Sequence, residues 1–297
     1  MTLPGTLEEL ELRIRTLLPE QYQDRYESVK PVSMGSAGLQ FGADGKVAWD
    51  EMWGSFCDLA MAGGPPHKGM LLEPGSAESI AELSERYAEV TAEICRGIQM
   101  VSEIPAVPSP EPGWIEADCE NATMAEWLAR AIVMENVSAF HRDGILFLPA
   151  GPNFRLEKEI KNVITAIAKT SHYWLDHMWF DQKRQIADLF AKMSESMPLL
   201  HPGDGQDAEL RTAIQNEIGV VTRFRPSPQS YPGWCGLDCA DVATAIWIMR
   251  ALVASNAMAR REGTTLFVPM NARVDPGGRK VIELTTQIWR HYKARHF

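Results

Sequence analysis

The sequence lacks the features that define several large classes of protein. It has no apolar run near the roughly 18 residues needed to cross a bilayer. Residues 1–5 do not resemble the basic and apolar start of a secretory signal. Acidic residues outnumber basic ones, for a net charge of -10, so the cationic surplus with which duplex nucleic-acid binders displace counterions is missing. We expect a cytoplasmic protein that binds neither nucleic acid nor membrane.

Several chemical signatures are missing as well. The five cysteines are an odd number in a long chain, which is typical of reduced thiols and not of a disulfide framework. The chain has no CxxC, HExxH or HxH arrangement of the kind that marks metal sites. A nucleophile elbow, a Rossmann fingerprint and a kinase signature are also missing. Triad-type, dinucleotide and ATP chemistry by those routes is therefore disfavoured, and the cofactor stays unknown.

The sequence does contain an internal repeat. A Gly-Trp-x-x-x-Asp-Cys motif begins at Gly113 and again at Gly233. Across residues 113–136, 10 of 24 positions match the residues 120 places later, whereas unrelated sequences would match at about one or two. A His-Tyr-x-x-x-His motif likewise begins at His172 and His291, at an offset of 119. These matches indicate a duplicated unit.

Each copy is predicted to alternate strand and helix. Apolar, β-branched runs at 98–104 and 218–224 predict strands. Apolar spacing predicts helices at 121–135 and 241–255, and strands follow at 145–149 and 265–269 before an outgoing helix. A divergent first copy is expected over 26–97, with strands at 28–34 and 69–74 and helices at 50–62 and 77–96.

The fold class is therefore α/β, a pseudo-symmetric body of two clear and one divergent strand-helix-strand-helix repeats with an N-terminal amphipathic helix. Thr6 followed by Glu9 is a capping-box signature for that helix, whose apolar stripe must be covered by the main body or by another subunit. Helices at 182–197 and 208–217 form a helical linker or cover. The expected segments are 1–25, 26–97, 98–177, 178–217 and 218–297.

The first copy departs from the others at residues 63–69, Gly-Gly-Pro-Pro-His-Lys-Gly. Glycine permits unusual backbone conformations and proline stiffens the chain, so His67 and Lys68 are expected on a rigid loop. With Asp58 just before the loop, these are the candidate catalytic residues, and His67 or Asp58 is the acid–base group. The alternative is a tight turn with incidental polar residues.

Basic residues open the outgoing helix of the second copy. Arg155 and Lys158 are candidate ligand-binding residues, because cations beside free helix amides attract a carboxylate or phosphate. The alternative is a self-paired surface through Arg155–Glu159 and Glu157–Lys161. Arg130 and Arg250, each three residues after a tryptophan, are further ligand-binding candidates. Pairing with an acid or packing on the indole is their structural alternative.

No metal site is assigned, and Cys57, His172 and His177 are only weak candidates. Five residues apart on a continuous helix, His172 and His177 lie about 140° apart. A shared metal would require the helix to end between them. His172 and Asp176 have the spacing for a carboxylate-oriented imidazole, and surface histidines among structural aromatic residues are the alternative.

These observations favour an enzyme that binds a small anionic metabolite in a cleft between repeats, with acid–base chemistry of hydrolase or lyase type. Two alternatives stay open. One is a non-catalytic binding or assembly protein that uses the duplicated surfaces, a homo-oligomer among them. The other is a metalloprotein that uses His, Cys and Asp. The sequence does not decide whether the chain is an enzyme.

Overall fold

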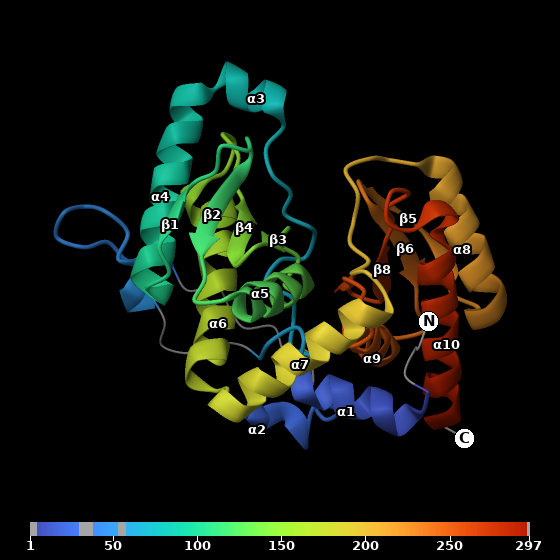
Figure 1. Cartoon of the computed structure of the whole chain (residues 1–297). Coiled ribbons are helices and arrows are strands. Elements are labelled where there is room, and N and C mark those ends of the chain that lie inside the picture. Colours follow the sequence, from blue (N-terminus) through green and yellow to red (C-terminus); the bar gives the residue numbers. More distant parts are fainter. Residues whose placement is uncertain (1–4, 30–37, 53–57, 296–297) are drawn as a thin grey trace. The chain divides into compact units, whose positions relative to one another are not determined.

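The computed structural model describes residues 5–29, 38–52 and 58–295, and the chain divides into two compact units. Unit 1 combines Met1–Asp24 with Phe180–Phe297, and unit 2 is Arg25–Trp179. Each unit mixes helices with one four-stranded antiparallel sheet (Figure 1). The predicted mixture of helix and sheet is therefore present.

Unit 2 is built on a sheet with strand order β1-β2-β4-β3. Its strands are β1 (Ala106–Pro108), β2 (Trp114–Asp118), β3 (Phe140–Arg142) and β4 (Ile145–Pro149). Its helices are η1 (Trp49–Met52), α3 (Ala77–Glu82), α4 (Ser84–Ser102), α5 (Ala122–Met134), the π-helical turn η2 (Leu156–Ile160) and α6 (Lys161–Asp176). Helix α4 packs along α6 and against β1, and α5 packs against α6, β3 and β4.

The core of unit 2 lies where α5 meets α6. Trp127 and Trp174 face each other there with ring centroids 5.5 Å apart, and both are buried. Burial of each large apolar side chain contributes roughly 1.5–3 kcal/mol. Helix α5 begins at Asn121, whose side chain accepts the Met124 amide at 2.9 Å, and the chain leaves it through Asn136 at φ 61°. Local capping thus sets both ends of the helix that carries this core.

Unit 1 has the strand order β5-β6-β8-β7. Its strands are β5 (Arg225–Tyr231), β6 (Trp234–Asp238), β7 (Arg260–Glu262) and β8 (Thr265–Pro269). Its helices are α1 (Leu7–Leu17), α2 (Glu20–Gln23), α7 (Phe180–Ser196), α8 (Ala208–Thr222), α9 (Val242–Val253), η3 (Pro276–Gly278) and α10 (Arg279–Arg295). Helix α10 packs against α8 and α9.

The predicted N-terminal helix is α1. The Thr6 side chain accepts the Glu9 amide at 3.1 Å, as the capping-box pattern requires. The apolar stripe of α1, including Leu10 and Ile14, is buried where the helix packs on α7 and α9. Its stripe is therefore covered within unit 1. The helices predicted at 182–197 and 208–217 are also present, as α7 and α8.

The strands predicted at 98–104 and 218–224 are wrong. Both runs lie at the ends of helices, since α4 continues to Ser102 and α8 to Thr222. Glu103 (φ 58°) and Arg223 (φ 65°) then end these helices in the left-handed conformation. The apolar residues form the buried side of each helix, and a short apolar run does not distinguish that arrangement from a strand. From α4 to α6, and again from α8 to α10, the order is therefore helix, two strands, helix, two strands, helix, with the short turns η2 and η3 before the last helix.

The element predictions for residues 26–97 also need correction. The expected helix at 50–62 is the short turn η1 followed, from Asp58, by an irregular turn, with residues 53–57 outside the described chain. The expected strand at 69–74 makes one isolated parallel bridge, Leu72 to Val137. Most of the strand expected at 28–34 lies outside the described residues. The helix expected at 77–96 is split into α3 and α4, so the boundary expected at residue 97 falls inside α4.

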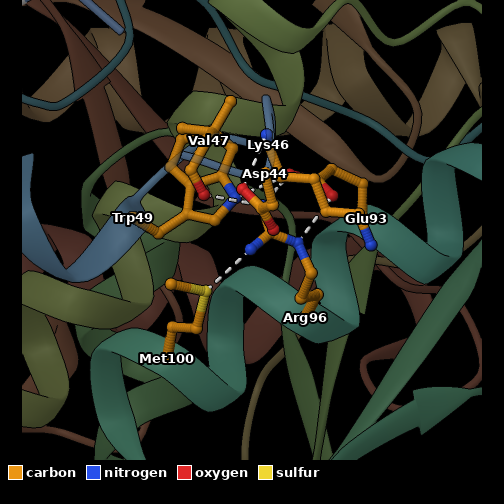
Figure 2. A network of polar contacts seen from close by, with 7 residues as sticks. All are labelled: Asp44, Lys46, Val47, Trp49, Glu93, Arg96 and Met100. Carbon is orange, nitrogen blue, oxygen red and sulfur yellow. Dashed lines mark hydrogen bonds and ion pairs between the residues drawn. The ribbon is translucent and has the colours of Figure 1, made fainter. Parts of the chain in front are cut away.

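A polar network holds residues 44–49 against α4 (Figure 2). Arg96 donates to the Val47 carbonyl oxygen at 2.7 Å and pairs with Glu93 at 2.7 Å. Trp49 Nε1 donates to the same Glu93 carboxylate at 2.7 Å. The hydrogen bonds with Glu93 raise the pKa of Arg96. The chain is thus fixed to α4 shortly before the turn that begins at Asp58.

Candidate functional site

A buried carboxylate organises residues 58–69 of unit 2. Glu135, directly after α5, is fully buried. Its Oε2 accepts hydrogen bonds from the Lys169 ammonium at 2.8 Å and from the His67 amide at 2.9 Å. Its Oε1 accepts a hydrogen bond from the Ala60 amide at 2.9 Å. A buried charge is tolerated only when it is paired and hydrogen-bonded. Glu135 therefore ties this turn to α5 and, through Lys169, to α6.

Backbone geometry holds the same turn in one conformation. Gly63 has φ 101°, a region that side chains rarely adopt, and a Cβ on Gly64 would lie 2.0 Å from the Asp58 carbonyl oxygen. Asn136 Nδ2 donates to the Lys68 carbonyl oxygen at 2.9 Å. Asp58, His67 and Lys68 thus belong to one turn with close backbone contacts. Asp58 itself is half-buried.

Within the described residues, the His67 side chain has no hydrogen-bond or ion-pair partner, unlike that of Lys68, which pairs with Glu159. Its imidazole is half-buried and forms no hydrogen bond with a residue of the described chain. Burial, together with the positive charges of Lys169 and Lys161, lowers the pKa of His67 to about 3. The imidazole is therefore neutral at pH 7, with one nitrogen able to donate and the other able to accept.

Glu159 connects the turn to the start of α6. Its Oε1 lies 3.6 Å from Lys68 Nζ and 3.2 Å from the Arg155 guanidinium, and its Oε2 accepts the Arg155 amide at 3.1 Å. Burial opposes ionisation, yet the Arg155 hydrogen bonds and the Lys68 charge lower the pKa of Glu159 to about 2. The structure therefore brings the candidates Lys68 and Arg155 together around one carboxylate.

This arrangement also contains the predicted self-pairing. Because Glu159 occupies the Arg155 amide and guanidinium, the expected pocket of free helix amides is partly filled by the protein itself. Lys158 is exposed, and its charge helps to lower the pKa of Lys68, after the larger effect of burial. Lys161 is half-buried, and burial lowers its pKa against the opposing charge of Glu157. Lys158 lies in the π-helical turn η2, and Lys161 is the first residue of α6. Turns of π-helix are frequent at functional sites.

Arg130 and Arg250, the two arginines that recur in the repeat, are buried within helices. Arg130 is fully buried on α5 and pairs with Glu126 one turn earlier. Burial lowers its pKa, and Glu126 opposes that effect. This pairing is the structural alternative expected for Arg130. Arg250 is buried on α9 and belongs to unit 1, whereas the other ligand-binding candidates belong to unit 2.

The weak metal candidates are only partly described. Cys57 lies outside the described residues. Helix α6 ends at Asp176, and His177 then lies with its Nε2 3.2 Å from Nε2 of His172. In the described part of the chain there is no group of three or more His, Cys, Asp or Glu side chains that could hold a metal ion. Burial raises the pKa of Cys119 and of Cys239 to about 12, so neither is a thiolate at pH 7.

Sequence reasoning missed Glu135 and Lys169. A signal was nevertheless available in the sequence, because both positions depart from the repeated pattern. At the offset of 120, Glu135 corresponds to Ser255, and at the offset of 119, Lys169 corresponds to Ile288. Glu135 and Lys169 are both charged, whereas the corresponding Ser255 and Ile288 are both uncharged. Such paired differences in otherwise apolar segments point to a buried ion pair.

Comparison with protein-family models, with curated proteins and with solved structures finds no match to this chain. Among the helices described, none is both long and apolar enough to span a membrane. A functional assignment therefore depends on the chemistry of the residues themselves.

Proposed function

We propose that this protein binds a small anionic metabolite, a carboxylate or a phosphate ester, in unit 2 between residues 58–69 and the start of α6. The observation that carries the proposal is His67, a half-buried neutral imidazole without a hydrogen-bond partner in the described chain. The charges of Lys169 and Lys161 act on it. An anion would accept a hydrogen bond from His67 and offset that positive field.

The balance of charge around the turn favours an anion over a cation. Among the charged groups that shift the pKa of His67, Lys68 or Lys161, four are basic and two are acidic. The basic groups are Arg155, Lys158, Lys161 and Lys169, and the acidic groups are Glu157 and Glu159. Each hydrogen bond to a charged partner contributes roughly 1.5–3 kcal/mol, which makes a few such contacts sufficient for a small ligand.

In the proposed cytoplasmic enzyme, the anion is the substrate of an acid–base reaction of hydrolase or lyase type. Before binding, the pKa of His67 of about 3 makes it a weak base. A bound anion counteracts the lysine charges and raises that pKa toward the range in which imidazole transfers protons at neutral pH. Asp58, in the same turn, is the second acid–base candidate. Substrate binding thus prepares His67 for catalysis.

The experiment compares the response of variants to inorganic phosphate, citrate and succinate by thermal shift and calorimetry. Bound ligand stabilises the folded protein according to its concentration and affinity. We expect a saturable rise in Tm for the unsubstituted protein that is lost in His67→Ala and reduced in Lys68→Ala. His201→Ala is the matched control, because His201 is exposed and lies in unit 1. An equal response in all four proteins, or none in any, contradicts the proposal.

We also propose that the two units contain copies of one duplicated module, of which only the copy in unit 2 carries the anion site. Trp114 pairs with Pro149 in one sheet as Trp234 pairs with Pro269 in the other. The segment before the first helix supports the same match. The Leu72 amide donates to the Asn136 carbonyl oxygen at 2.8 Å, and the Leu200 amide donates to the Asn256 carbonyl oxygen at 2.9 Å. On this proposal the copies extend over about residues 71–177 and 199–295.

An experimental structure tests this duplication by superposition of the two segments. We expect the helices, sheets and left-handed asparagines to coincide, and a different strand order in either segment contradicts it. The alternative of an assembly protein has less support, because the stripe of α1 that it would use is buried within unit 1. Size-exclusion chromatography with light scattering checks for the homo-oligomer that this alternative requires.

A further inference from the structure

We propose that the C-terminal end of α6 binds a divalent transition-metal ion between His172 and His177, a site separate from the proposed anion site. The two Nε2 atoms lie 3.2 Å apart and form a hydrogen bond, so a bound ion would take the place of the proton between them. In a tetrahedral zinc site with metal–nitrogen distances of about 2.0–2.1 Å, two nitrogen ligands lie about 3.3–3.4 Å apart. The two imidazoles therefore already have nearly the separation that a shared ion requires.

The second ring nitrogen of His172 is held by a carboxylate. His172 Nδ1 lies 2.7 Å from Asp176 Oδ2, so Nδ1–H donates to the carboxylate and the lone pair is left on Nε2. Histidine ligands of metals commonly donate their other ring N–H to a carboxylate in this way, which fixes the ring and increases the basicity of the ligand nitrogen. Asp176 is thus a positioning residue and not a third ligand.

The end of the helix makes this geometry possible. On a continuous helix the two histidines would point about 140° apart. Helix α6 stops at Asp176, and His177 is the C-cap with φ −120° and ψ 4°, its amide donating to the Tyr173 carbonyl oxygen at 3.2 Å. The Tyr173 ring lies beside both imidazoles, at 5.8 Å from His172 and 5.4 Å from His177. The change of backbone direction turns the second imidazole back toward the first.

The ligand set indicates which ions fit. Imidazole nitrogen prefers zinc, nickel and copper to magnesium and calcium. The His172 side chain is 37% exposed, so water can reach the ion and fill the positions that His172 and His177 leave open.

Two features of the chain help to test the metal site: its distance from the start of α6, and a corresponding histidine in unit 1. Lys161 and His172 are separated by 11 residues of α6, about 16 Å along the helix, so a change at His172 leaves the start of the helix intact. In unit 1, His291 occupies the position that matches His172, but Arg295 replaces the carboxylate and pairs with Glu11 at 3.0 Å. His291→Ala is therefore the matched control.

The experiment uses the full chain, treated with a chelator and dialysed, and titrates it with Zn²⁺ and separately with Mg²⁺. Thermal shift reports stabilisation, and Co²⁺ substitution reports tetrahedral nitrogen ligation through its visible absorption. We expect saturable Zn²⁺ binding, no response to Mg²⁺, loss of the Zn²⁺ response in His172→Ala and in His177→Gln, and retention in His291→Ala. Asp176→Asn should weaken Zn²⁺ binding about 10- to 100-fold.

Circular dichroism of each variant separates loss of binding from loss of folding, and His172→Gln serves as the second variant if His172→Ala fails to fold. Absence of saturable Zn²⁺ binding in the unsubstituted protein would overturn the proposal. So would a Zn²⁺ response that persists in folded variants lacking either histidine. The anion experiments are distinguishable from both outcomes, because they depend on His67 and Lys68 and can use the same chelator-treated and dialysed protein without added metal.

Discussion

Lys169 Nζ donates to Glu135 Oε2 over 2.8 Å in the interior of unit 2, where both side chains are almost fully buried. Under the proposed duplication, the positions in unit 1 that correspond to Lys169 and Glu135 are Ile288 and Ser255, and both are buried without charge. On that proposal, the module packs in unit 1 without this ion pair. Since a buried ion pair is weak evidence for stability, its specific effect is to hold the His67 and Ala60 amides against Glu135.

Removal of one member of this pair should destabilise the protein. Glu135→Gln leaves the Lys169 ammonium buried without its counter-charge, which costs about 3–5 kcal/mol. Urea denaturation measures the change in the free energy of unfolding. The double variant Glu135→Gln with Lys169→Met should recover part of that loss, since no charge stays buried. If Glu135→Gln lowered the free energy of unfolding by less than the double variant does, the assignment of a buried ion pair would be contradicted.

The pKa of His67 should respond to the lysine at the start of α6. Lys161→Met removes one of the positive charges that lower it, so the pKa should rise from about 3 while burial keeps it below 6.5. Titration of the imidazole by NMR measures the change. Lys158→Met is the control, because the exposed Lys158 is not among the causes of the shift at His67. If the pKa of His67 changed equally in Lys161→Met and Lys158→Met, the charge of Lys161 would have no direct effect on His67.

Stability should fall as the pH decreases toward 3, partly because of His67. In the unfolded chain His67 binds a proton below about 6.5, whereas in the folded chain it does so only near 3. The unfolded state therefore takes up more protons in this window and is favoured as the pH falls. After allowance for partial exposure, the contribution is about 2 kcal/mol.

The measurement is Tm at pH 7.5 and 5.5, compared between the unsubstituted protein and His67→Gln. This interval lies above the range from 4.5 to about 2 in which protonation of Glu159 also lowers stability. The variant should lose less stability over the interval than the unsubstituted protein does. Parallel pH profiles would assign the acid sensitivity to other groups.

The two left-handed asparagines offer a matched pair of substitutions. Asn136 (φ 61°) donates to the Lys68 carbonyl oxygen at 2.9 Å, and Asn256 (φ 65°) donates to that of Met197 at 2.7 Å. Alanine at either position loses the hydrogen bond and strains the backbone, for about 2–3 kcal/mol. Glycine relieves the strain and should cost less than alanine, as thermal unfolding would show.

Ligand response then separates the two asparagines. Asn136→Gly loosens the turn that carries His67 and should reduce anion binding, whereas Asn256→Gly in unit 1 should leave it unchanged. A reduction of equal size in both variants would indicate a general effect of lost stability. It would not support a site localised to residues 58–69.

Features that depend on neighbouring residues were predictable from the sequence. Thr6 caps α1 through the Glu9 amide three residues away. The glycines and prolines of residues 63–69 predicted an unusual backbone, because these residues act on their own conformation, and Gly63 has φ 101°. Periodicity failed at 98–104 and 218–224, where an apolar run fits a buried helix as well as a strand.

The duplicated motifs are visible in the sequence itself. The sequence also determined the helix cap and the unusual turn, since each of these arises from interactions within a few residues. Only the tertiary structure decided that Glu135 meets Lys169 across 34 positions, that His67 has a pKa of about 3, and that Glu159 joins Lys68 to Arg155. These features depend on burial and on electrostatic interactions between groups distant in the chain. Both are properties of the folded arrangement, because desolvation and charge proximity arise only when distant segments pack together.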